Sequence, residues 1–168
     1  TVPAACALNR IQVHKQPAVL RFLVAKFRGL PLTSNDGDGT PTQQLVSNRM
    51  KDVVKASAIH PVTSTAAANC ASVLAQAGVS LAGVSWRGAR LPHAVLSSAV
   101  LSCADLRDAD LQHCILHKAV FDGVCFAGAN MQGVQVGKMP HLKGHANFTH
   151  GVAFSPNGTQ LASASFDC

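Results

Sequence analysis

The chain has 168 residues, of which 48% are hydrophobic and 13% charged, a composition that excludes a disordered polypeptide. Fourteen Lys and Arg against eight Asp and no Glu give a net charge of +6. These basic residues are spread out, without a basic run interleaved with aromatic residues, so no nucleic-acid partner is expected. No charged segment followed by an apolar one opens the chain, and polar residues interrupt its most apolar stretch, 66–86. We therefore expect neither export nor a membrane span.

The six cysteines show neither a CxxC pair nor the dense spacing of a disulfide-rich secreted protein. This pattern is typical of reduced thiols, and it predicts a cytoplasmic protein.

Residues 1–62 are expected to form a helical segment that contains a loop at 30–42. Pro17 suits the first turn of a helix over 18–28, and Gly29 stands where a C-terminal cap belongs. A second helix is predicted over 43–57 from its apolar spacing. Aspartates and glycines at 36–39 hint at a calcium loop, but the further ligands of such a loop are missing, so no calcium site is predicted.

Residues 63–78 predict a third helix, with Thr63, Ser64 and Thr65 as candidate N-caps and Gly78 at its exit. The helix leads directly into a repetitive segment. Because a stack of repeats leaves its ends apolar and its edges unpaired, this helix is expected to cap that stack.

From 79 to 138 an apolar residue returns at every fifth position, and a small apolar residue lies two places before it. Side chains two apart along an extended chain point the same way, so both are expected to face inward and the other three outward. The predicted core residues are Leu81, Trp86, Leu91, Leu96, Leu101, Leu106, Leu111, Leu116, Phe121, Phe126, Met131 and Val136.

Three stretches, 104–108, 109–113 and 129–133, carry Ala, then Asp or Asn, then Leu or Met, and resemble the pentapeptide repeat family. The resemblance implies a right-handed, four-sided β-helix of about three coils over 79–138. Within it, Trp86 is expected beside the capping helix, and Cys114 is expected to be a buried structural thiol.

Residues 139–168 are predicted to be a linker and a hairpin, with Val152 and Phe154 facing inward and a Pro-Asn-Gly turn before Leu161. Gly144-His145 and the two strand patterns resemble the opening of a WD40 repeat. That resemblance implies an incomplete propeller blade in which His145 is held by Ser165 and Asp167. The order of parts further resembles the C-terminal sensor half of NACHT-type signalling NTPases, which implies an upstream nucleotide-binding domain and downstream blades.

Together these patterns predict a mainly β fold with a helical N-terminal part. Its parts are a helical segment over 1–62, a capping helix over 63–78, a β-helix over 79–138, and a linker with a partial blade over 139–168.

The sequence contains no nucleophile, phosphate-loop or metalloprotease motif. His113, Cys114 and His117 are close in sequence, but the repeat register turns Cys114 inward and both histidines outward, whereas zinc needs converging ligands. Asp105, Asp108 and Asp110 are expected on a solvated face. No catalytic, cofactor-binding or metal-binding residue is therefore predicted, and the chain is not expected to be an enzyme.

The sequence thus favours a non-enzymatic scaffold or protein–protein interaction module, a piece of a larger intracellular signalling or adaptor protein with an unidentified protein partner. One alternative is a DNA-mimicking, topoisomerase-binding pentapeptide protein. It is disfavoured because residues 79–138 hold four Asp against five Lys and Arg, a local sum of +1. Another is the non-catalytic part of an enzyme whose nucleotide-binding domain lies outside this chain.

Overall fold

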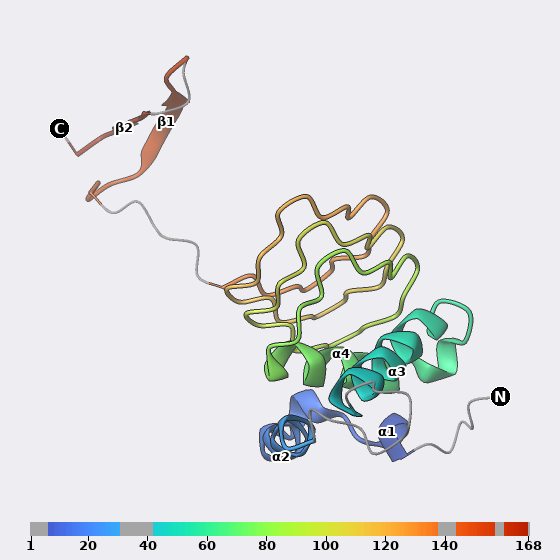
Figure 1. Cartoon of the computed structure of the whole chain (residues 1–168). Helices are drawn as coiled ribbons and strands as arrows, with labels where there is room; N and C mark the ends of the chain where they lie inside the picture. Colours follow the sequence, from blue (N-terminus) through green and yellow to red (C-terminus); the bar gives the residue numbers. More distant parts are fainter. Residues whose placement is uncertain (1–6, 31–41, 138–143, 157–159, 168) are drawn as a thin grey trace. The chain divides into compact units, whose positions relative to one another are not determined.

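The computed structural model describes residues 7–30, 42–137, 144–156 and 160–167. The chain divides into two compact units, residues 1–137 and 138–168. The first unit consists of helices and a stack of turns (Figure 1). Residues 31–41, which include most of the predicted loop at 30–42 and the rejected calcium motif, lie outside the described residues, as does most of the linker.

The helical part of the first unit contains four α-helices and two 3-10 helices among the described residues. These are α1 (Ala7–Arg10), η1 (Val13–Lys15), α2 (Pro17–Arg28), α3 (Thr42–Ala56), η2 (Pro61–Thr63) and α4 (Ser64–Ala77). Proline begins α2 because its fixed φ suits a first turn. Gly78 ends α4 in the left-handed conformation, at φ +80°, as the sequence predicts. In the described part of the chain, no helix has the length and apolar character needed to cross a membrane.

Helix α4 lies at the centre of this part and packs against α1, α2 and α3. Its residues from Ala66 to Ala75 are all buried. Asn69 on α4 also fixes the segment before α2: its Nδ2 donates to the Ile11 carbonyl (2.5 Å) and its Oδ1 accepts from the Val13 N–H (3.3 Å). A single polar side chain of this buried helix thereby orders a stretch of chain that has little regular structure of its own.

Residues 79–137 form a column of successive turns, here called the repeat stack. Parallel bridges join residues twenty apart, as in Ser85 with Asp105 and Asp105 with Cys125. Each level is fixed by backbone hydrogen bonds in both directions along the stack, such as Leu81 N–H to the Val100 carbonyl and Asp105 N–H to the Val84 carbonyl, both 2.9 Å. An offset of twenty residues is four repeats of five, so one level of the stack holds four repeats.

The first level of the stack lacks a preceding level, and side chains from the helical part bind its backbone instead. The Ser57 hydroxyl accepts from Arg90 N–H (2.9 Å), and the Ser72 hydroxyl accepts from Val95 N–H (2.8 Å). The Gln76 amide donates to the Ser97 carbonyl (3.0 Å). These contacts supply the partners that an end of a stack otherwise leaves unsatisfied, and α4 lies against the first turns in Figure 1.

The second unit contains a hairpin of β1 (Thr149–Phe154) and β2 (Leu161–Ser165), paired antiparallel with Val152 opposite Ser163. Val152, expected to point inward, is 62% exposed. The prediction was wrong because two strands alone provide no second layer to cover either face. The predicted Pro-Asn-Gly turn lies largely outside the described residues.

The predicted fold class was also wrong. In the part of the chain that the structure describes, regular strands occur only in β1 and β2, six and five residues long, whereas α2, α3 and α4 hold 12, 15 and 14 residues. Neither a β-helix nor a propeller blade is formed there. The physical reason is that each five-residue repeat contributes a single bridged residue between two turns, which is too short to make a strand.

Candidate functional site: the outward rows of the repeat stack

The side chains that the sequence assigns to the core of the repeats become more exposed from the start of the stack to its end. Leu81, Trp86 and the six leucines from 91 to 116 are no more than 2% exposed. Phe121 and Phe126 are partly buried, whereas Met131 is 37% and Val136 48% exposed. Burial decreases along the stack because the last level has no further described level above it.

Each repeat ends in a residue that turns the chain with a positive φ. Glycine fills this position at 83, 88, 123, 128 and 133, where a left-handed backbone costs little. The middle of the stack instead carries side chains there, with φ between 56° and 60°, at His93, Ser98, Cys103, Asp108, His113 and Lys118. These side chains therefore project from fixed corners of the stack.

Outward side chains twenty residues apart form rows along the stack, because the bridges hold successive levels in one register. Arg87 pairs with Asp108 (3.2 Å), and Arg107 pairs with Asp105 through Nη2 (2.7 Å) and Nε (2.8 Å). Hydrogen bonds from the Arg107 side chain and its backbone N–H lower the pKa of Asp105 to about 2. Asp105 and Asp108 are therefore each paired with an arginine on the outside of the stack.

Three histidines form a ladder of parallel rings, here called the histidine ladder. The His14 ring from η1 stacks on His93 with ring centres 4.6 Å apart, and His93 stacks on His113 at 5.0 Å. Burial lowers the pKa of His14, and the neighbouring His93 and Lys15 lower it further. The ladder continues over Gly133, where an added Cβ would collide with the His113 ring.

The thiol of Cys114 is buried inside the stack and donates to the Leu91 carbonyl at 3.0 Å. Desolvation raises its pKa to about 12. His113 and His117 on either side of it are exposed. Across the residues that the structure describes, no three His, Cys, Asp or Glu side chains come together in a way that could hold a metal ion.

In the second unit, the His145 ring bonds to Asp167 through Nδ1 (3.0 Å) and to the Ser163 hydroxyl through Nε2 (2.8 Å). Ser165, which the sequence assigns to this set, instead donates to the Asn147 carbonyl (3.2 Å) and also bonds to Asp167. Ser163 and Ser165 lie on one face of β2, since side chains two apart share a face. The backbone N–H of Ala146, with His145 and Ser165, lowers the pKa of Asp167 to about 2.

The sequence did not predict the histidine ladder, nor the hydrogen bonds that Ser57 and Ser72 accept from the first level of the stack. The twenty-residue spacing of His93 and His113 was visible in the sequence and could have suggested a row. The contribution of His14 had no local signal, because 79 residues separate it from His93.

The family comparison supports the repeat assignment for one segment. The family described as Pentapeptide repeats (8 copies) matches residues 77–112 and 99–135. No curated protein matches the chain. The resemblances of 144–167 to a WD40 repeat and of the whole to NACHT-type NTPases stay predictions. The segment from 77 to 135 is a run of pentapeptide repeats, built as a stack of turns on the capping helix α4.

Proposed function

We propose that the chain is a non-enzymatic scaffold that binds a protein partner, as part of a larger intracellular signalling or adaptor protein. The observation that carries this proposal is an apolar row on the outside of the repeat stack. Val100 and Val120, bridged to each other, are 41% and 39% exposed, and the bridged pair Val95 and Ile115 in the repeats next to them is partly buried. Branched apolar side chains on a hydrogen-bonded column give a partner a rigid surface to cover.

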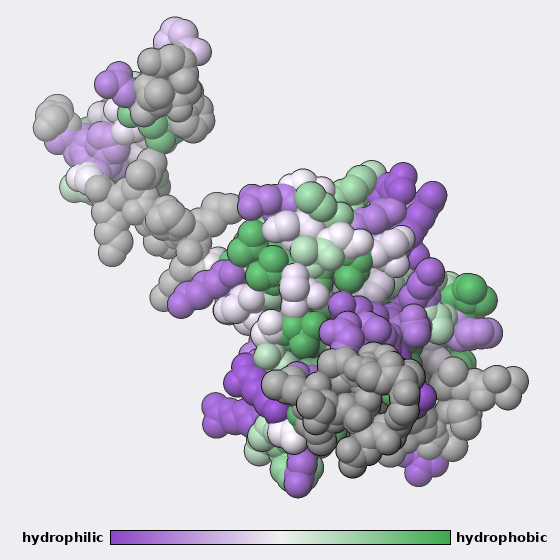
Figure 2. Space-filling view, in the orientation of Figure 1, coloured by the Kyte–Doolittle hydropathy of each residue, from purple (hydrophilic) through white to green (hydrophobic). Residues whose placement is uncertain are grey.

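The surroundings of this row fit protein recognition. In Figure 2 hydrophobic and hydrophilic side chains are interspersed on the visible face of the stack. Interfaces of this kind combine an apolar centre with a polar rim. Residues with ionised, mutually paired side chains, such as Arg87 and Asp108, would contribute orientation more than affinity.

The pKa shifts of two groups in the stack argue against a catalytic role. A general base is most effective with a pKa near neutrality, and a reactive thiol needs a lowered pKa. Asp105 is shifted down by its arginine, and Cys114 is shifted up by burial. Both shifts therefore suit structural positions.

DNA mimicry is disfavoured by the ion pairs of the stack. A mimic of a duplex needs an uncompensated acidic surface, whereas Asp105 and Asp108 each have an arginine partner. Free thiols at Cys103, Cys114 and Cys125 support a cytoplasmic location. The upstream nucleotide-binding domain and the downstream repeats of the parent protein stay predictions.

The proposal is tested by affinity capture from the source cell with the complete chain, its Val100→Ser/Val120→Ser variant and a Gln132→Ala control. We expect the wild-type chain and the control to retain the same partner and the valine variant to lose it. Retention of the same proteins by all three would contradict the proposal. Inhibition of gyrase supercoiling at stoichiometric amounts of the chain would instead favour DNA mimicry.

A further inference from the structure

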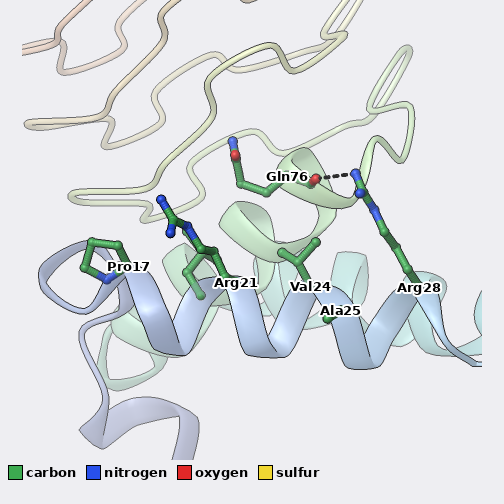
Figure 3. A pocket seen from close by; sticks show the side chains of 7 residues that line it. Pro17, Arg21, Val24, Ala25, Arg28 and Gln76 are labelled. Carbon is green, nitrogen blue, oxygen red and sulfur yellow. Dashed lines mark hydrogen bonds between the residues drawn. The ribbon is translucent and has the colours of Figure 1, made fainter.

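A groove with a volume of about 520 Å³ lies between α2 and the C-terminal end of α4, away from the outward rows of the stack. We call it the α2–α4 groove. Its lining includes Pro17, Leu20, Arg21, Val24, Arg28 and Gln76. Figure 3 shows Arg21 and Arg28 rising from α2 on either side of Val24, with Gln76 behind them on α4.

The floor of the groove is apolar and its far wall is fixed. Leu20 and Val24 are 8% and 9% exposed, so they offer a shallow hydrophobic surface. The Arg28 side chain donates to the Gln76 carbonyl through Nη2 (2.8 Å) and to the Ala77 carbonyl through Nε (3.3 Å). These bonds hold one guanidinium at the end of the groove and leave some of its five N–H donors for another acceptor.

The charged side chains of the helical segments that form the groove are all positive. Residues 7–30 hold five Lys and Arg and no acidic residue, and Ser64–Ala77 of α4 holds no charged residue. The Arg21 side chain forms no hydrogen bond or ion pair with any residue that the structure describes, and it is exposed. Because an exposed guanidinium in such a setting is not neutralised, the groove is complementary to an anionic ligand.

We propose that the α2–α4 groove binds an acidic peptide segment of a protein partner, with an apolar side chain on Leu20 and Val24 and carboxylates on Arg21 and Arg28. Arginine matches a carboxylate with two parallel hydrogen bonds. A concave apolar floor suits a peptide side chain, whereas a phosphate backbone or a lipid headgroup would use only the two arginines. This inference goes beyond the proposed function, because it does not depend on the apolar row of the stack.

Fluorescence anisotropy of a short labelled peptide, in which glutamates flank a single leucine, tests the proposal on the complete chain. We expect Arg21→Ala to weaken binding about tenfold, since one charged hydrogen-bonded pair is lost. Ala25→Trp should weaken binding at least as much, because Ala25 lines the groove and the larger side chain fills it without changing the charge. Lys26→Ala is the matched control: it removes an equal charge from α2 outside the groove lining.

Three results would overturn the proposal. Equal weakening by Arg21→Ala and Lys26→Ala would mean unspecific charge attraction. Equal binding of a peptide with glutamines in place of glutamates would mean apolar adhesion. Displacement of the peptide by anionic lipid vesicles or by RNA, in a manner that requires Arg21, would assign the groove to another class of ligand. Circular dichroism of each variant checks folding, and the Val100→Ser/Val120→Ser variant should bind the peptide as the wild type does.

Discussion

The histidine ladder links two parts of the first unit through single side chains. His14 belongs to η1, next to the buried Val13, whereas His93 and His113 belong to the repeat stack. Neutral rings stack well, but a charged His14 would face His93 and Lys15, and α4 behind η1 holds no charged side chain that could compensate. The contact is therefore most stable while His14 is neutral.

Because of this contact, the free energy of unfolding of the first unit should decrease as the pH is lowered. The pKa of His14 lies below its ordinary value of 6.5, so the neutral form is favoured on folding. Its stabilising contribution is present above pH 6.5 and is lost as the pH falls below that value. Urea unfolding followed by the emission of Trp86, the single tryptophan, should show a smaller loss between pH 7.5 and 5 in His14→Gln than in the wild type.

The matched control for this titration is His60→Gln, which alters a histidine outside the ladder and should follow the wild-type pH profile. If His14→Gln also follows the wild-type profile, the ladder does not couple stability to protonation.

At the scale of elements, α4 caps the stack by substituting side chains for a missing level. The repeat pattern joins an N–H to a carbonyl nineteen residues later, as in Gly83 with Ser102. The Ser97 carbonyl would by that rule accept from residue 78, whose N–H is already used to end α4. The Gln76 amide takes its place, so the end of the helix and the start of the stack share one set of hydrogen bonds.

Ser72→Ala should lower the free energy of unfolding by about 1–3 kcal/mol, because Val95 N–H would be left without an acceptor. Ser102→Ala, in the body of the stack, is the control and should change the free energy by less than about 0.5 kcal/mol. Urea denaturation followed by Trp86 emission measures both. An equal effect of the two substitutions would show that the serine cap does not stabilise the stack.

How much of this could be read from the sequence differs between elements. Gly78, Pro17 and the fivefold return of leucine are local signals, and they predicted helix ends and inward residues. The class of the fold could not be read in the same way. Whether a residue such as Asp105 sits in a strand or in an isolated bridge depends on the turns beside it, and the pattern of inward residues is the same in both cases.

The candidate sites were harder to predict because their members come from distant segments. Gln76 and Arg28, or His14 and His93, meet only after α4 has packed against both α2 and the stack. In the structure His145 bonds to Asp167 and Ser163, whereas Ser165, which shares a face of β2 with Ser163, bonds to the Asn147 carbonyl.

At the scale of the whole molecule, the stack is modular in steps of one level. Deleting residues 99–118 removes twenty residues and joins Ser98 to Ala119, which takes the position of Ala99 in the pattern. We expect this variant to fold with Trp86 still buried. Deleting 99–116 removes eighteen residues and places inward positions outside, so we expect it to lose cooperative unfolding.

The emission maximum of Trp86 and the slope of the urea transition distinguish these two outcomes. Loss of folding in both variants would show that the levels of the stack are not interchangeable. Folding of the eighteen-residue deletion would show that the inward register does not determine the structure.

The twenty-residue offset also determines the direction in which each outward side chain points around the axis of the stack. Since four repeats complete one level, a gain or loss of five residues leaves every leucine inside but advances all later side chains by a quarter turn. The chain would then leave the stack after Val136 from a different side, while the interior stayed unchanged. In a longer protein, an insertion or deletion of five residues would change the direction in which the segment after the stack leaves it, without changing the core of the stack.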